Sequence, residues 1–159
     1  MCAPAHPVKM KKSFSLIEVL VFVSIVALFF VAAAAVSVAT LRNMIINEHK
    51  IVATRYAEEL SEWLRSEKEA DWNLFYTNVS ASACGLTNRC FTSVAGSEDQ
   101  VWLNSCNPCG LIDNLYSRTV DFSTNPGPPP RVDTTVNVSW QELGNTYTVP
   151  IKTGFSLFE

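Results

Sequence analysis

The sequence has few residues of the kinds that catalytic and metal sites need. It contains only two histidines, no glycine-rich phosphate-binding loop and no histidines at metal-ligand spacing. His49 lies beside Glu48 in a segment expected to be helical, where a solvated position is favoured over a general-base role. These absences argue against an enzyme, and they predict no metal site and no cofactor.

Acidic residues are missing from the start of the chain. None precedes Phe14, whereas Lys9, Lys11 and Lys12 all do. The formal net charge of −3 therefore hides an asymmetry, because 9 of the 12 basic residues and all 15 acidic residues follow Ser13, a net charge of −6. An acidic exterior repels polyanions, which argues against nucleic acid as a partner of the folded part.

Formal charges are also missing from the 23 residues between Val19 and Leu41. A helix of that length spans roughly 34 Å, enough to cross the hydrocarbon core of a bilayer. Three lysines precede this segment, whereas Arg42 is the only basic residue in the seven that follow it. The positive-inside rule then puts the N-terminus in the cytoplasm and the residues after Leu41 outside. We therefore predict a single-pass protein of the cytoplasmic membrane.

Glu18 interrupts the beginning of this apolar stretch. A carboxylate inside a membrane costs about 2.5 kcal/mol or more, and it is functional by default. The segment Lys11-Lys12-Ser13-Phe14-Ser15-Leu16-Ile17-Glu18-Val19-Leu20 resembles the cleavage motif of type IV prepilins and type II secretion pseudopilins. The shared features are a basic leader, a small residue, a phenylalanine, a glutamate at one fixed spacing and a long apolar helix. The strong resemblance covers about 30 residues of this chain.

The resemblance implies processing and assembly. A prepilin peptidase would cut after Ser13 and N-methylate the new amine of Phe14, and Glu18 would neutralise the Phe14 amine of a neighbouring subunit. Paired charges in apolar surroundings largely compensate each other and also fix the register of the helices. Two departures stand out: Ser13 replaces the usual glycine, and the apolar segment has no proline, which predicts a straighter helix.

Three other interpretations of this segment stay open. A secretory signal peptide would use the lysines as its n-region and residues 32–35 as its cleavage site. Its apolar region is usually roughly 7–15 residues long and has no use for Glu18. The segment can also be an uncleaved anchor, and Glu18 can lie at headgroup depth, where the lysines keep it solvated.

Cysteines form an even set once Cys2, which falls in the predicted leader, is set aside. Four cysteines in a small exported domain predict two disulfides, with three possible pairings. The four are Cys84, Cys90, Cys106 and Cys109. Cys106-Asn-Pro-Cys109 resembles a thioredoxin-type redox motif, but no βαβ pattern surrounds it. A zinc site is a further alternative, with irregular ligand spacing.

Apolar residues beyond the membrane segment recur at spacings of three, four and seven, which predicts an amphipathic helical stem. They are Leu41, Ile45, Val52, Tyr56, Leu60, Trp63 and Leu64. Asp71-Trp72-Asn73 suggests the end of this helix. Residues 73–114 show little periodicity and hold the four cysteines, so we expect a loop-rich, stapled connection there.

The C-terminal part shows strand patterns. The predicted strands are Leu115–Phe122, Val132–Leu143 and Tyr147–Phe158. In the first, one side carries Tyr116, Arg118, Val120 and Phe122. Gly144-Asn145 predicts a hairpin turn, and Pro150 places the last strand at a sheet edge or a bulge. We therefore expect an α+β fold, in which a long N-terminal helix packs on a small antiparallel β-sheet head.

The expected organisation is a cleaved leader at 1–13, a transmembrane and assembly helix at 14–41, a stem helix at 42–72 and a β head at 73–159. The resemblance implies a minor pilin or pseudopilin, a structural subunit of a type IV pilus or a type II secretion-like filament at the cell surface. Its partners would be the prepilin peptidase, other pilin subunits and the membrane.

Two alternative functions stay open. One is a filament-displayed adhesin or DNA-uptake tip protein that uses the loops between Asn73 and Asn114 as its recognition surface. The other is a membrane-anchored extracytoplasmic thiol oxidoreductase, which requires a reactive Cys106.

Overall fold

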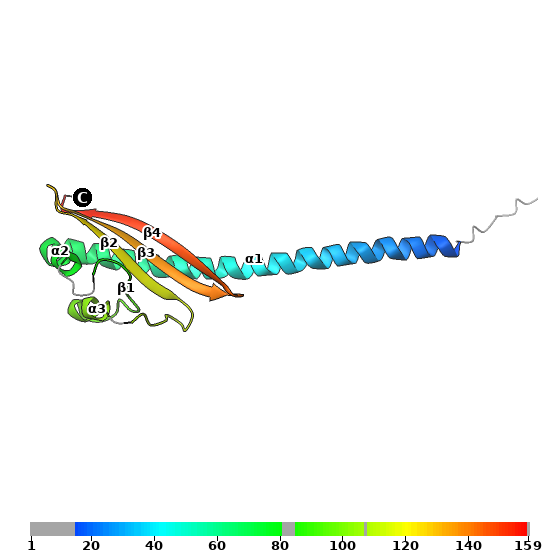
Figure 1. The fold of residues 1–159 in the computed structure, drawn as a ribbon, viewed down its shortest axis with the longest axis horizontal. Coiled ribbons are helices and arrows are strands. Elements are labelled where there is room, and N and C mark those ends of the chain that lie inside the picture. Colours follow the sequence, from blue (N-terminus) through cyan, green and yellow to red (C-terminus); the bar gives the residue numbers. More distant parts are fainter. Residues whose placement is uncertain (1–14, 81–84, 107, 159) are drawn as a thin grey trace, which may run out of the picture. The chain divides into compact units, whose positions relative to one another are not determined.

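A computed structural model describes residues 15–80, 85–106 and 108–158 of the chain (Figure 1). The elements are helices α1 (Leu16–Ala70), α2 (Trp72–Ser80) and α3 (Glu98–Asn104), and strands β1 (Arg89–Cys90), β2 (Ser117–Asn125), β3 (Arg131–Glu142) and β4 (Asn145–Ser156). The fold is α+β, as the sequence predicts, with a long N-terminal helix packed on a four-stranded antiparallel sheet. The chain divides after Met44 into two compact units.

Helix α1 begins in the first unit and is 55 residues long. It runs without a break because the stretch from Leu16 to Ala70 contains neither proline nor glycine, the two residues that most disfavour a helix interior. The Ser15 carbonyl accepts hydrogen bonds from the backbone N–H groups of Glu18 at 3.0 Å and Val19 at 3.3 Å, which start the helix.

The second unit contains the sheet, whose strands lie in the order β1-β2-β3-β4. Because β4 is an edge strand, Pro150 lies at a sheet edge, and that prediction is confirmed. The hairpin between β3 and β4 turns one residue earlier than predicted. Glu142 pairs with Asn145, and the two turn residues are Leu143 and Gly144, with φ of 51° and 80°. Positive φ at both central residues is the signature of a type I′ hairpin turn.

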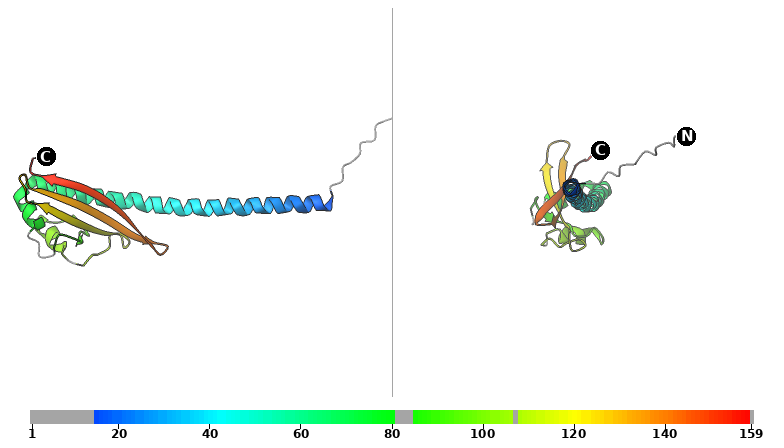
Figure 2. Two further views of the ribbon diagram at one scale, coloured as in Figure 1. Left: turned by 45° about the horizontal axis from the view of Figure 1, so that its top comes forward. Right: turned by 90° about the vertical axis from the view of Figure 1, so that its right-hand side faces the viewer.

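One face of the sheet packs on the C-terminal part of α1 (Figure 2). At helical spacing, Ala53, Ala57, Leu60 and Leu64 of α1 have no exposed surface. The even-numbered residues of β2 and β3 complete this core. They include Val120, Phe122, Val132, Val136, Val138 and Trp140. The side predicted for the first strand is confirmed, since Tyr116, Arg118, Val120 and Phe122 are all buried.

The apolar stripe predicted for the stem helix begins too early. Leu41 and Ile45 are 60% and 46% exposed, since the first apolar α1 residue that packs against the core is Val52. The predicted end of the helix is correct, because α1 stops at Ala70 and Asp71 caps a new helix. Its Oδ1 accepts hydrogen bonds from the backbone N–H groups of Asn73 at 2.8 Å and Leu74 at 3.1 Å.

The segment at 73–114 is less loop-rich than predicted, because α2 and α3 lie within or at the edge of it. Phe75 and Val79 of α2 and Val101 and Trp102 of α3 are buried in the same core as α1 and the sheet. The two helices have 9 and 7 residues, too few for a helical period to be recognised in the sequence.

Candidate assembly segment and polar contacts of the head

Glu18 lies in the first turn of α1 and is exposed. The partial positive charge of the free backbone N–H groups at a helix start favours a carboxylate there. Among the described residues, the ion pairs do not include Glu18, so its carboxylate has no cationic partner from that part of its own chain. The predicted cleavage-site residues Ser13 and Phe14 lie outside the described residues.

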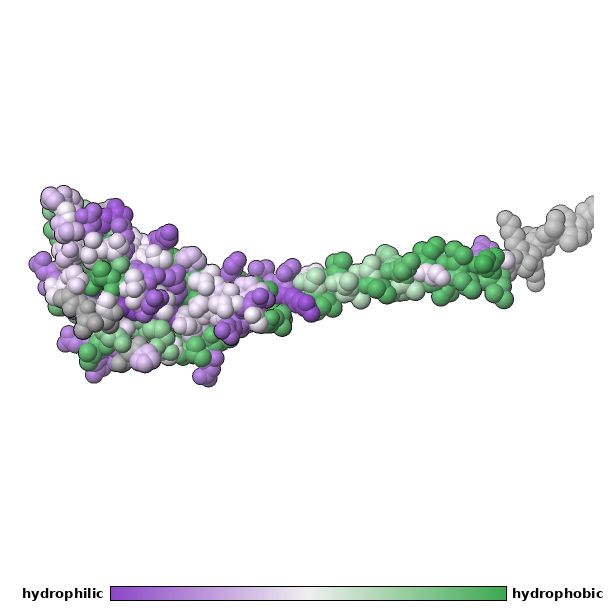
Figure 3. Space-filling view, in the orientation of Figure 1, coloured by the Kyte–Doolittle hydropathy of each residue, from purple (hydrophilic) through white to green (hydrophobic). Residues whose placement is uncertain are grey.

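The rest of α1 in the first unit presents an apolar surface (Figure 3). Leu28, Phe29 and Val31 are 72%, 70% and 68% exposed, and nearly all large apolar side chains from Leu16 to Leu41 are exposed. Soluble monomers rarely expose contiguous apolar patches of more than a few hundred Å². By its length and composition, α1 is able to cross a membrane.

The hydroxyl groups of this segment are satisfied within the helix. Ser24, Ser37 and Thr40 each donate a hydrogen bond of 2.9 Å to the carbonyl four residues earlier. A hydroxyl bonded in this way loses little on leaving water. Glu18 is therefore the one strongly polar side chain between Leu16 and Leu41.

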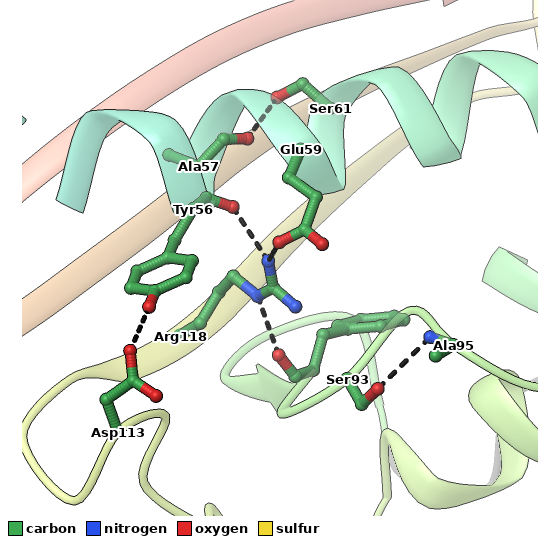
Figure 4. Close-up of polar contacts among 9 residues, drawn as sticks. Tyr56, Ala57, Glu59, Ser61, Ser93, Ala95, Asp113 and Arg118 are labelled. Carbon is green, nitrogen blue, oxygen red and sulfur yellow. Dashed lines mark hydrogen bonds and ion pairs between the residues drawn. The ribbon is translucent and has the colours of Figure 1, made fainter. Parts of the chain in front are cut away.

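In the second unit, Arg118 of β2 joins three parts of the fold (Figure 4). Its guanidinium donates to the Phe91 carbonyl at 2.7 Å and, from Nη1, to the Tyr56 carbonyl at 2.8 Å and the Glu59 carboxylate at 2.9 Å. Burial lowers the pKa of Arg118, and the hydrogen bond and charge of Glu59 oppose that shift. The contacts tie β2 and the segment after β1 to α1.

Tyr56 extends the same network to the loop before β2. Its hydroxyl donates a hydrogen bond to the Asp113 carboxylate. That hydrogen bond, with smaller contributions from burial and the charge of Asp113, raises the pKa of Tyr56 above its ordinary value of 10.0. Asp113 has φ of 50°, so the contact fixes a loop residue in the left-handed region.

Arg89 of β1 is a second buried cation, only 2% exposed. It donates to the Ser105 hydroxyl at 2.8 Å and the Asn78 carbonyl at 3.0 Å, and its guanidinium carbon lies 5.1 Å from the centre of the Trp102 ring. Burial lowers the pKa of Arg89 to about 10. These contacts hold α2, α3 and β1 together.

His49 is partly buried and not fully solvated, which differs from the position that the sequence favoured. Its Nδ1 is 2.7 Å from the Tyr116 hydroxyl, and its Nε2 is 4.0 Å from Oε2 of Glu142. Its side chain is 30% exposed. Burial and, to a smaller extent, nearby carboxylates raise the pKa of Tyr116. The contacts connect α1 with the ends of β2 and β3.

Cys90 and Cys109 form a disulfide, and Cys106 is also disulfide-bonded. Cys84 lies outside the described residues. Since Cys109 is joined to Cys90, Cys106 and Cys109 are not a redox pair, and the thioredoxin-type interpretation is wrong for this state of the chain. The disulfides also remove the thiolates that the zinc alternative requires.

Sequence reasoning missed most of the polar contacts of the head. Arg118 was placed on the correct face of its strand, but the pattern gave no sign of its partners, because Tyr56, Glu59 and Phe91 are distant in sequence. Arg89 carried no signal, since one arginine in a loop-like segment is usually solvated.

Comparison with protein-family models found no matching family, and comparisons with curated proteins and with solved structures found no significant match for this chain.

Proposed function

We propose that this protein is a minor pilin or pseudopilin, a non-catalytic subunit of a type IV pilus or a type II secretion-like filament. One observation carries the proposal. The exposed apolar part of α1 contains a single charged side chain, Glu18, in its first turn, and the same unbroken helix continues into an α+β head. A helix that only anchors the protein needs no carboxylate at that position. A helix that assembles with other helices can pair the carboxylate with a positive charge of a neighbouring subunit.

The proposed assembly step is charge pairing between subunits. After cleavage following Ser13, Phe14 carries a cationic, N-methylated amine at the edge of the membrane. Glu18 of a neighbouring subunit supplies the opposite charge. Each charge is costly alone in apolar surroundings, so only a register that pairs them is stable, while apolar contacts along the two helices supply the attraction.

The proposed location follows from the same segment. The lysines before Phe14 hold the N-terminus in the cytoplasm, α1 crosses the cytoplasmic membrane, and the head is exported. An oxidising compartment outside the cytoplasm is also where the Cys90–Cys109 disulfide persists. The partners are the prepilin peptidase and other pilin subunits.

Processing by a prepilin peptidase tests the proposal. The full chain is expressed with an active peptidase or with a catalytically inactive one, and its N-terminus is determined by mass spectrometry. We expect methylated Phe14 with the active enzyme only. An intact leader with both enzymes, or an N-terminus within residues 33–38, would contradict the proposal.

A further inference from the structure

A groove opens beside the end of the sheet where β2 begins and the β3–β4 hairpin turns. Its volume is about 410 Å³, which lies within the roughly 300–1,000 Å³ of small-molecule sites. Its polar lining consists of Asn114 from the loop before β2, together with Ser117, Ser139, Gln141 and Thr146 from three strands. Ser117 pairs with Ser139, and Gln141 pairs with Thr146, so strand pairing fixes their spacing.

The polar lining carries no formal charge. Its two amides and three hydroxyls can each donate and accept hydrogen bonds. Within the described part of the chain, none of these five side chains has a hydrogen-bond partner. They are therefore available to a ligand that offers several donors and acceptors at once. A charged ligand would find no opposite charge here to offset its loss of hydration.

An apolar wall completes the groove. Leu111 and Leu115 line it, and Leu111 is 54% exposed. A wholly apolar ligand would leave the amides and hydroxyls without partners. A ring with hydroxyls on its rim and C–H groups on one face matches both kinds of lining. We propose that this groove binds a neutral carbohydrate.

The outer face of the sheet extends the groove. The row Ser117, Ser139 and Thr148 is followed by the row Thr119, Asn137 and Pro150, and neither row has a charged residue. Neighbouring strands lie about 4.8 Å apart, so the hydroxyls of these rows are regularly spaced, while the Asn137 amide donates a hydrogen bond to the Asp121 carboxylate at 3.0 Å. Charge first appears in the third row, with Asp121 and Lys152. This surface suits an oligosaccharide better than a single sugar.

The groove belongs to the second unit and contains no residue of α1. Carbohydrate binding is therefore separable from filament assembly, which depends on the first turn of α1. The site also lies mainly outside the loops between Asn73 and Asn114, where sequence analysis placed a recognition surface. Only Leu111 and Asn114 of the lining belong to that segment.

The test uses the full chain in zwitterionic detergent, because a maltoside headgroup would itself be a candidate ligand. Binding is measured on an array of neutral and acidic oligosaccharides and then quantified by titration of the best neutral one. The variants are Asn114→Ala, Gln141→Ala and, as a control on the same sheet face outside the groove, Ser123→Ala. Subunit incorporation into filaments is followed for each.

We expect binding to a neutral oligosaccharide, lowered about three- to tenfold by each groove substitution and unchanged by Ser123→Ala. Incorporation into filaments should be unaffected by all three. No binding to any neutral glycan, binding to acidic glycans alone, or equal affinity for the groove variants and the control would each overturn the proposal. If the unsubstituted chain fails to enter filaments, the proposed function is contradicted. The proposal of a carbohydrate site is not affected by that result.

Discussion

Arg118 and Glu59 form an ion pair with very unequal exposure. Nη1 of Arg118 is 2.9 Å from Oε2 of Glu59, yet the arginine side chain is 1% exposed and the glutamate side chain 51%. Water stabilises the exposed Glu59 carboxylate with or without its partner. The buried Arg118 guanidinium also donates hydrogen bonds to two backbone carbonyls. The arginine therefore matters more to the head as a multiple donor than as one half of a salt bridge.

The first prediction follows from that asymmetry. Arg118→Met removes the side-chain donor of the Phe91 carbonyl and the additional donor that the Tyr56 carbonyl has beside its bond within α1, and it should lower the free energy of unfolding by about 2–4 kcal/mol. The matched control is Arg65→Met, since Arg65 and Glu62 are an exposed pair on α1 whose loss should cost less than about 0.5 kcal/mol. Urea unfolding followed by tryptophan fluorescence measures both, because all 4 tryptophans lie in the second unit. Equal losses of unfolding free energy for the two variants would contradict the role of Arg118 as a multiple hydrogen-bond donor.

A second prediction concerns pH. The Tyr56 pKa in the folded chain is raised above 10.0, mainly by the hydrogen bond to Asp113, so the unfolded chain loses this proton first as pH rises. The contact therefore contributes its full stability below about pH 10 and loses it progressively above that pH. The stability advantage of the unsubstituted chain over Tyr56→Phe should be constant from pH 8 to just below pH 10 and should shrink from there to pH 11.

Tyr76→Phe is the control for this experiment, since within the described residues the Tyr76 hydroxyl has no hydrogen-bond partner. Its stability difference from the unsubstituted chain should change less with pH. If the Tyr56→Phe difference stays constant or grows toward pH 11, the Tyr56–Asp113 hydrogen bond does not have the assigned role.

The third prediction concerns the cysteines. Peptide mapping of exported protein should link Cys90 to Cys109 and find no free thiol in the mature chain. Replacing both cysteines by alanine should lower the free energy of unfolding by about 3 kcal/mol, because the disulfide closes a loop with a sequence separation of 19. Free thiols at both positions together with stoichiometric zinc would support the metal site instead.

The parts of the fold that sequence predicted correctly depend on periodic signals. The period-two strand containing Val136, Val138 and Trp140 and the uncharged run of α1 are long enough to show their pattern. Helix α3 and the capping role of Asp71 were missed because each depends on one or two turns of chain. The groove could not be predicted for a different reason. The pairing of β2 with β3 sets Ser117 opposite Ser139, and that of β3 with β4 sets Gln141 opposite Thr146, and the sequence does not reveal either register.

The last prediction is that Glu18→Ala separates membrane insertion from filament assembly. Insertion depends on the apolar surface of α1 and the lysine-rich leader, and the substitution makes the helix more apolar, so the subunit should still reach the membrane and be cleaved. What is lost is the partner of the Phe14 amine in the adjacent subunit. An unpaired charge in apolar surroundings costs several kcal/mol, so incorporation should fall by roughly a hundredfold or more.

The control for this substitution is Glu69→Ala, which removes an exposed carboxylate from the last turns of the same helix and should leave incorporation unchanged. Membrane fractions and sheared filaments are compared for the unsubstituted chain and both variants, with crosslinking to partner pilins. A Glu18→Ala subunit that is processed and enters filaments at the unsubstituted level would mean that Glu18 is a solvated interfacial residue. A Glu18→Ala subunit that fails to reach the membrane would instead place its role in insertion, because the pairing mechanism acts only after the helix is in the bilayer.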